Sequence, residues 1–164
     1  MVAGLPPRAK FGLAPSPHCS SMASPSKMTE KPARVVATAL LVDDEAYFRK
    51  FVGQVLKKAL VTRVIEARDG EEGVKLFREH PPEFVLLDIN MPRMGGVETL
   101  IALRKVSADV PIIMLTSVSE EKVVEECVGH GATYFIRKDV PAGQLAAALH
   151  EALDEFLGQK QPSP

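Results

Sequence analysis

The chain has little of what marks extracellular, nucleic-acid-binding or membrane proteins. Its 164 residues include only two cysteines, Cys19 in a polar stretch and Cys127 in an apolar helical pattern, so we expect neither a disulfide framework nor a cysteine metal site. The formal net charge is -1, which leaves no basic excess to attract nucleic acid or anionic lipid. No apolar run approaches the roughly 20 residues that span a bilayer. We therefore expect a cytoplasmic protein whose partners are neither nucleic acids nor membranes.

The first residues have the composition of a disordered segment. Residues 1–33 carry repeated prolines among serine, alanine and glycine, with no acidic residue before Glu30. A segment of this kind buries too little apolar surface to order itself. The sequence therefore predicts a disordered leader over residues 1–33, one folded domain over 35–157 and a flexible tail over 158–164.

Within the folded region, short apolar runs alternate with helical patterns, as in a parallel sheet whose strands are joined by crossover helices. Several runs are apolar at nearly every position, which strands covered on both faces require. The expected strands are Val35–Val42, Arg63–Ala67, Phe84–Asp88, Ile112–Thr116 and Tyr134–Lys138. The pattern predicts one α/β domain with five parallel strands.

Five intervening stretches carry apolar residues at the three-and-four spacing of a buried helical stripe. Two of them follow the spacing of a capping box, Asp69 with Glu72 and Ser117 with Glu120. The last begins near Pro141, a residue tolerated in the first turn of a helix. The helical residues expected to face the core are Phe48, Phe51, Val52, Val55, Leu56, Ala59, Val97, Leu100, Ile101, Val123, Val124, Cys127, Val128, Leu145, Leu149, Ala152, Leu153 and Phe156.

Polar residues stand at the ends of four of the expected strands. The first strand is followed by Asp43 and Asp44, the third ends in Asp88, the fourth in Thr116 and the fifth in Lys138. In open parallel sheets, ligands sit outside the carboxyl ends of the strands. Three carboxylates gathered there would repel one another unless a cation intervenes, and a site of oxygen ligands suits Mg²⁺. We therefore predict a Mg²⁺ site at this edge.

The same residues have the chemistry that phosphoryl transfer needs. Asp88 can act as the nucleophile, the Lys138 ammonium can neutralise an oxyanion, and the Thr116 hydroxyl can hydrogen-bond a phosphoryl oxygen. Phosphoryl transfer depends mainly on in-line positioning and on neutralisation of charge. The sequence therefore predicts that Asp88 accepts a phosphoryl group beside Mg²⁺.

The segments LLVDDE, FVLLDINMP, MLTS and FIRK closely resemble the response-regulator receiver domains of two-component signalling, over residues 35–157. The resemblance implies a flavodoxin-like fold, with a doubly wound five-stranded parallel sheet in the order 2-1-3-4-5 and five helices. It also implies that a histidine kinase or a histidine phosphotransfer protein phosphorylates Asp88. The expected output surface is the fourth helix, the fifth strand and the fifth helix, which would act on a separate effector protein.

The resemblance also assigns roles to single residues. Asp44 would ligate Mg²⁺ directly, Asp43 would do so through water and Asn90 through its backbone carbonyl, with Asp88 completing the metal site. Phe135 matches the position of the aromatic switch residue, whose packing follows the movement of the threonine toward the phosphoryl group.

One position departs from the family pattern. The family usually has a proline directly after the lysine, joined by a cis peptide bond, whereas here Asp139 follows Lys138. A cis bond before a non-proline residue costs about 2.5 to 4 kcal/mol, so we predict a trans bond between these residues. We also expect Asp139 to cap the last helix.

Other functions remain as alternatives. An aspartyl-phosphate-forming phosphohydrolase, similar to haloacid-dehalogenase phosphatases, would need an acid two residues after the nucleophile, and that residue is Asn90. A flavin or nucleotide module would need a first loop rich in glycine or hydroxyl groups, but this loop contains Asp43, Asp44 and Glu45. We therefore expect a signalling switch that is not a turnover enzyme. It would either regulate its effector directly or pass the phosphoryl group along a phosphorelay.

Overall fold

The computed structural model describes residues 37–59, 61–117 and 121–158, where five strands and five helices alternate along the chain. The strands are β1 (Thr38–Val42), β2 (Arg63–Ala67), β3 (Phe84–Asp88), β4 (Ile112–Thr116) and β5 (Tyr134–Arg137). The helices are α1 (Ala46–Lys58), α2 (Gly70–Glu79), α3 (Gly96–Val106), α4 (Glu121–Gly129) and α5 (Ala142–Gly158).

The predicted bounds agree closely with these elements. Three strands, β2, β3 and β4, have the predicted ends, and β5 ends one residue before Lys138. The predicted start of the first strand, the leader predicted over residues 1–33 and most of the tail predicted over 158–164 lie outside the described residues. Within the described ranges, no helix is both long enough and apolar enough to cross a bilayer.

All strand pairs are parallel, and their order is β2-β1-β3-β4-β5, as predicted. The register decides which residues meet at the carboxyl edge. Val42 pairs with Leu87, so Asp43 follows β1 at the level where Asp88 ends β3. Thr116 likewise pairs with Arg137, so Lys138 follows at the next level. The sheet therefore brings the polar strand ends to one edge.

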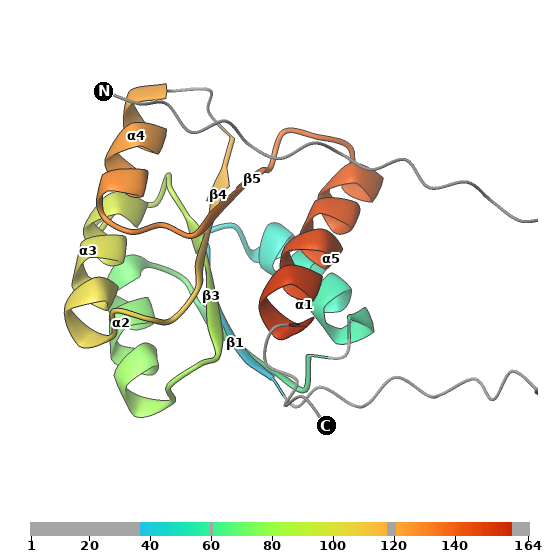
Figure 1. The fold of residues 1–164 in the computed structure, drawn as a ribbon, viewed down its shortest axis with the longest axis horizontal. Coiled ribbons are helices and arrows are strands. Elements are labelled where there is room, and N and C mark those ends of the chain that lie inside the picture. Colours follow the sequence, from blue (N-terminus) through green and yellow to red (C-terminus); the bar gives the residue numbers. More distant parts are fainter. Residues whose placement is uncertain (1–36, 60, 118–120, 159–164) are drawn as a thin grey trace, which may run out of the picture. The chain divides into compact units, whose positions relative to one another are not determined.

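Helices cover both faces of the sheet, with α1 and α5 on one face and α2, α3 and α4 on the other (Figure 1). Because successive side chains of a strand point to opposite faces, a strand covered on both sides must be apolar throughout. The central strand β3 is buried at all five positions, which explains the continuous apolar run of its sequence.

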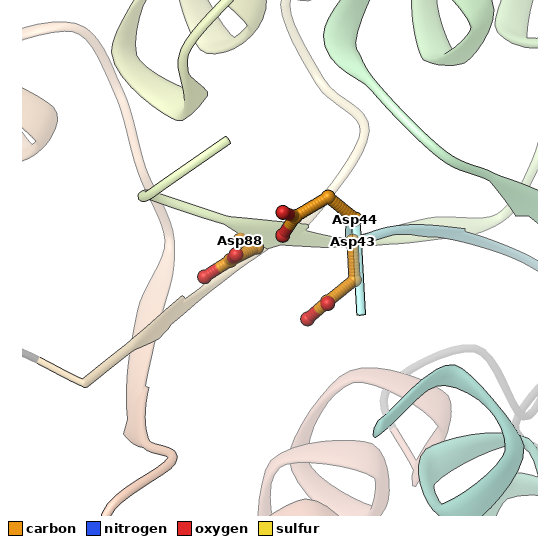
Figure 2. Close-up of side chains that lie close together, drawn as sticks. All are labelled: Asp43, Asp44 and Asp88. Carbon is orange, nitrogen blue, oxygen red and sulfur yellow. The ribbon is translucent and has the colours of Figure 1, made fainter. Parts of the chain in front are cut away.

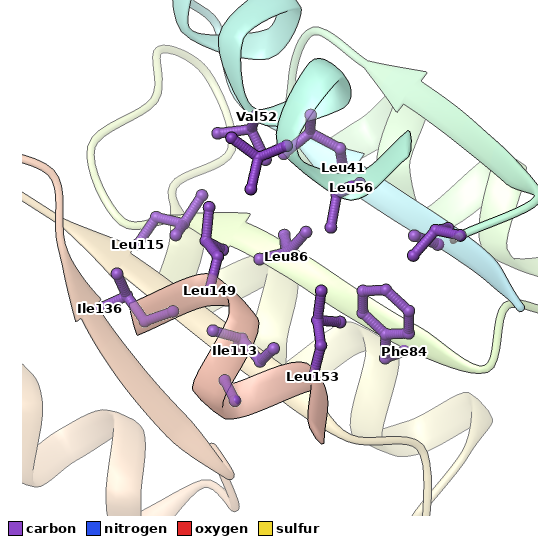
Figure 3. Packing of buried hydrophobic residues seen from close by; sticks show 14 of the residues in the cluster. Leu41, Val52, Leu56, Phe84, Leu86, Ile113, Leu115, Ile136, Leu149 and Leu153 are labelled. Atoms are coloured by element: carbon purple, nitrogen blue, oxygen red, sulfur yellow. The ribbon is translucent and has the colours of Figure 1, made fainter. Parts of the chain in front are cut away.

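Two hydrophobic clusters result, one on each face. Figure 3 shows the cluster under α1 and α5, where strand residues such as Leu41 and Leu86 meet Val52 and Leu56 of α1. On the other face, the alternate strand residues Leu40, Val42, Val85, Leu87 and Met114 pack under α2, α3 and α4. Each fully buried aliphatic side chain contributes about 1.5 to 3 kcal/mol relative to an exposed one. The two clusters fix the sheet that carries the polar edge.

The core residues predicted for the helices are buried or partly buried except at one position. Val128 was expected to face the core but is 57% exposed. Its neighbour Cys127 is fully buried and is a free thiol. Cys127 faces the cluster between α4 and the sheet, and Val128, about 100° further around the helix, lies on the exposed side. The prediction for Val128 is therefore wrong.

The predicted cap of α2 is present in a modified form. The Asp69 carboxylate accepts a hydrogen bond of 2.9 Å from the backbone N–H of Glu72. The Glu72 carboxylate, however, accepts from the N–H of Arg68 rather than from that of Asp69, at 2.8 Å. Of the second predicted capping box, Glu120 lies outside the described residues.

Candidate functional site

The site lies at the carboxyl edge of the sheet, in the loops that follow β1, β3 and β5 and at the end of β4. The carboxylate oxygens of Asp43, Asp44 and Asp88 lie within 4.8 Å of one another. Figure 2 shows these side chains gathered at two adjacent strand ends. Asp43 and Asp88 are buried, whereas Asp44 is exposed. The three carboxylates predicted to form a metal site are therefore together.

Three hydrogen bonds hold the backbone and carboxylate of Asp43, in addition to one from the Lys138 ammonium. Its N–H donates to the Ala67 carbonyl at 3.1 Å, and its carboxylate accepts from the Glu45 N–H at 2.8 Å. Its carbonyl accepts from the guanidinium of Arg49 at 2.7 Å. These contacts fix the turn between β1 and α1, and hence the direction of the acidic pair.

Arg49 supports the site through the Asp43 carbonyl and was not among the predicted site residues. Its side chain is only 11% exposed, and its Nε lies 3.5 Å from a carboxylate oxygen of Glu66 on β2. The charge is therefore buried between α1 and the sheet and compensated there, as a buried cation requires. A basic residue within the apolar stripe of the first helix was the available signal.

The ammonium of Lys138 reaches the centre of the site. Its Nζ donates to an oxygen of Asp43 at 2.8 Å and to one of Glu45 at 3.3 Å, and it lies 3.4 Å from Oδ1 of Asp88. Its backbone N–H donates to the Thr116 carbonyl at 2.7 Å, and its side chain is only 7% exposed. Lys138 therefore lies beside the acidic cluster, as its position at the end of the fifth strand predicts.

The remaining predicted residues lie around this centre. Thr116 is buried at the end of β4, beside the segment that carries Lys138. Asn90 is exposed in the loop after β3, two residues beyond Asp88. Phe135 is partly buried in β5 and packs against the cluster under α2, α3 and α4. Asp43, Asp44, Asp88, Thr116 and Lys138 thus gather at one edge, whereas Phe135 lies on a face of the sheet.

The region that carries these residues also matches a known protein family. Residues 39–150, well over half of the chain, match the model of the response regulator receiver domain. The chain belongs to this family. Receiver domains are the signalling switches of two-component systems and are not turnover enzymes.

Two characterised relatives and one solved structure show the range of this similarity. The nitrate/nitrite response regulator protein NarL of Escherichia coli is 38% identical over 117 residues, which are 71% of this chain and 54% of NarL. The chemotaxis protein CheY of Bacillus subtilis is 32% identical over 115 residues, which are 70% of this chain and 96% of CheY. The chain therefore spans about half of NarL but nearly all of CheY.

The structure is the CheX-CheY-BeF3-Mg+2 complex from Borrelia burgdorferi, one chain of which is similar in both fold and sequence. It has a TM-score of 0.66 and 28% identity, and the match covers 73% of this chain and 89% of that chain. The fold of the receiver domain is thus established independently of the motifs.

In this receiver domain, burial shifts the pKa values of the ionisable groups at the carboxyl edge of the sheet. Burial raises the pKa of Asp88 to about 6, although the Lys138 ammonium opposes the shift. Burial also raises the pKa of Asp43, against the hydrogen bond that Lys138 donates. Burial alone would lower the pKa of Lys138, but the hydrogen bond to Asp43 and the surrounding carboxylates raise it. The site therefore favours a cation beside its carboxylates.

One carboxylate oxygen is left without a hydrogen bond. Oδ1 of Asp88 is fully buried and has no hydrogen-bond partner among the described residues, although Lys138 lies nearby. Buried polar atoms in folded proteins nearly always have a partner. This oxygen is therefore an acceptor available to a bound group, and three oxygen donors within 4.8 Å fit a hard divalent cation such as Mg²⁺.

The junction after Lys138 confirms one prediction and contradicts another. The peptide bond between Lys138 and Asp139 is trans, as are all others in the described ranges. Asp139, however, does not cap α5. The helix begins at Ala142, and the Asp139 carboxylate instead accepts two hydrogen bonds from the Arg137 guanidinium. The Asp139 carboxylate is therefore paired with Arg137 in the segment between β5 and α5 and is not directed at the first turn of α5.

Proposed function

We propose that this receiver domain is a phosphorylation-activated switch of a two-component phosphorelay, in which Asp88 accepts a phosphoryl group. The donor would be the phosphohistidine of a histidine kinase or of a histidine phosphotransfer protein. One observation carries the proposal: the buried Asp88 carboxylate has an oxygen without a hydrogen bond, next to two further carboxylates and to the Lys138 ammonium.

The proposed cofactor is Mg²⁺, held by Asp43, Asp44 and Asp88 and by the backbone carbonyl of Asn90. When bound, the ion would neutralise the clustered carboxylates and the oxygens of the incoming phosphoryl group. The grouping of three oxygen donors supports this assignment. A similar chain in the Borrelia burgdorferi complex belongs to a structure whose components include Mg²⁺.

The residues of the chain would divide the remaining work. A carboxylate oxygen of Asp88 forms the new P–O bond while the P–N bond to the donor histidine breaks, and the imidazole leaves. Lys138 places a fixed positive charge 3.4 Å from Asp88, where charge on the phosphoryl oxygens must be offset. The hydroxyl group of Thr116 would donate a hydrogen bond to one of the phosphoryl oxygens.

The altered surface would regulate a separate effector protein in the cytoplasm, through α4, β5 and α5. The helix α4 presents the exposed Val128 together with the exposed acids Glu125 and Glu126. An exposed apolar residue on a helix that also carries exposed acids is suited to a protein partner, and the acids would favour a basic one. Phe135 of β5 would act as the switch residue by changing its packing once Thr116 moves.

The decisive experiment is phosphorylation by a small donor. The protein is incubated with acetyl phosphate and Mg²⁺, and we expect a mass increase of about 80 Da that is stable to acid and labile to base. Asp88→Asn should abolish the adduct, and removal of Mg²⁺ with EDTA should suppress it. Asp154→Asn, an exposed position on α5, is the matched control and should be phosphorylated like the wild type. An adduct that persists in Asp88→Asn would refute the proposal.

A further inference from the structure

The Lys138 ammonium is enclosed by the first turns of α1 as well as by carboxylates. Its Nζ lies 4.2 Å from the centroid of the Phe48 ring. Phe48 is partly buried and packs against the core cluster under α1 and α5. The ring is thus anchored in the core on one side and contacts the cation on the other.

This contact has a physical function that the carboxylates do not supply. A lysine side chain is a flexible stem whose ammonium can adopt many positions. The face of an aromatic ring carries negative potential and attracts a cation within about 6 Å, most strongly where water is excluded. Since the Lys138 side chain is only 7% exposed, the ring and the ammonium meet in a largely dry environment.

The two carboxylate oxygens closest to the Lys138 ammonium are not those of Asp88. Its two hydrogen bonds go to Asp43 and Glu45, which both belong to the segment before α1, whereas Asp88 is 3.4 Å away. Glu45 is exposed, so water competes for the hydrogen bond between its carboxylate and the ammonium. Phe48 belongs to α1 and places its ring 4.2 Å from the ammonium, a contact that does not depend on these acids.

We propose that Phe48 is a positioning residue for Lys138, whose ring keeps the ammonium beside Asp88 before a phosphodonor arrives. Phe48 touches no reacting atom and acts only through Lys138. The inference rests on the proposed function, because it concerns the speed with which Asp88 accepts a phosphoryl group.

The chain offers a matched control for the loss of this ring. Phe51 lies on the same helix, its ring centroid is 6.4 Å from that of Phe48, and it packs against the same core cluster. Phe48→Leu and Phe51→Leu each remove one ring from that cluster, but only the first removes the ring beneath Lys138. Phe48→Tyr restores an aromatic face at the partly exposed position.

The first readout is nuclear magnetic resonance of the metal-free protein, which requires no phosphorylation. Protons above an aromatic face are shifted upfield, so we expect upfield Cε protons of Lys138 in the wild type, in Phe48→Tyr and in Phe51→Leu. In Phe48→Leu they should return to the ordinary lysine range. A wild-type spectrum without the upfield shift, or an unchanged one in Phe48→Leu, would overturn the proposal.

The second readout is the rate of Asp88 phosphorylation by acetyl phosphate at a fixed Mg²⁺ concentration. We expect Phe48→Leu to be about 3- to 10-fold slower than Phe51→Leu, and Phe48→Tyr to recover most of the rate. Equal rates in the two leucine variants would refute the positioning role. If the wild type itself is not phosphorylated, the proposed function fails, and with it the role of Phe48, even where the ring contact is observed.

Discussion

The guanidinium of Arg104 on α3 donates two hydrogen bonds to the carbonyl of Gly131, 27 residues further along the chain, at 3.0 and 2.7 Å. The same group donates to the carbonyls of Val110 at 2.7 Å and Ala108 at 3.2 Å. It therefore joins the end of α3 to the loop before β4 and to the turn between α4 and β5. One side chain on α3 thus satisfies backbone acceptors in two other segments.

We expect Arg104→Ala to lower the free energy of unfolding by about 2 to 4 kcal/mol, because several carbonyls lose a charged donor at once. Arg104→Lys should recover only part of this loss, since an ammonium cannot span acceptors that a planar guanidinium reaches together. Urea unfolding measures both values. The exposed neighbour Lys105→Ala is the control and should change stability by less than about 0.5 kcal/mol. Full recovery by lysine would contradict the bridging role.

Asp88→Asn should stabilise the metal-free protein at neutral pH. Burial raises the pKa of Asp88 from 3.8 to about 6, so the folded state binds this proton more tightly than the unfolded state. The contribution of Asp88 to stability is therefore greatest at low pH and falls as the pH rises to about 6. We expect the variant to be more stable by about 1 to 3 kcal/mol at pH values well above that range, and equally stable at pH values below about 4.

Urea unfolding in EDTA over this pH range tests the prediction, with Asp154→Asn at an exposed position as the control. A stability difference that does not change with pH would show that the asparagine acts through packing rather than through loss of the buried charge.

Gly96→Ala should distort the position of Asp88. A Cβ at Gly96 would lie 2.3 Å from the Asp88 carbonyl oxygen and 2.6 Å from Cα of Ile89, and neither backbone atom can move without shifting β3. We expect a loss of about 1 to 3 kcal/mol in unfolding free energy and slower phosphorylation by acetyl phosphate. Gly143→Ala, on α5, has no atom within 4 Å of its new Cβ and should stabilise the protein by up to about 1 kcal/mol. Similar effects of the two substitutions would disprove the steric account.

Asp69→Ala should destabilise α2 by about 1 to 2 kcal/mol at neutral pH, because the helix loses its cap and the pairing of Asp69 with Arg93. The hydrogen bond from Glu72 and the Arg93 charge hold the pKa of Asp69 below its usual value. This stabilisation is therefore present above the ordinary pKa of 3.8 and disappears as the pH falls below it.

Thermal unfolding at neutral and acidic pH measures the effect, and the difference between Asp69→Ala and the wild type should shrink in acid. Asp69→Asn retains an acceptor for the Glu72 N–H and should lose less stability. An alanine variant as stable as the wild type at neutral pH would exclude the cap as a stabilising feature.

The local pattern of apolar and polar residues was sufficient to predict the strands and the polar edge of the sheet. The bounds of β3 followed from a continuous apolar run, and Asp88 was found because a carboxylate ends that run. The strand order could not follow from periodicity, since any doubly wound arrangement of such strands has the same pattern. It was predicted from the resemblance, and the pairing of β1 with both β2 and β3 confirms it.

Contacts between distant segments were beyond reach of the sequence. Arg49, Phe48 and Arg104 are ordinary helix residues until the fold places a carbonyl or an ammonium next to them. The two wrong predictions have local causes. Val128 lies on the exposed side of α4 beside the buried Cys127, and the Asp139 carboxylate is hydrogen-bonded to Arg137, two residues away, rather than to the start of α5.

Because Cys127 is buried under α4, the opening of this helix can be measured without an introduced label. Its sulfur lies in the cluster between α4 and the sheet, so a thiol reagent reaches it only when the helix opens away from the strands. In a Cys19→Ser variant, the rate at which the reagent modifies Cys127 reports the rate or the extent of that opening. The chain therefore carries its own chemical probe in the helix through which its signal would leave.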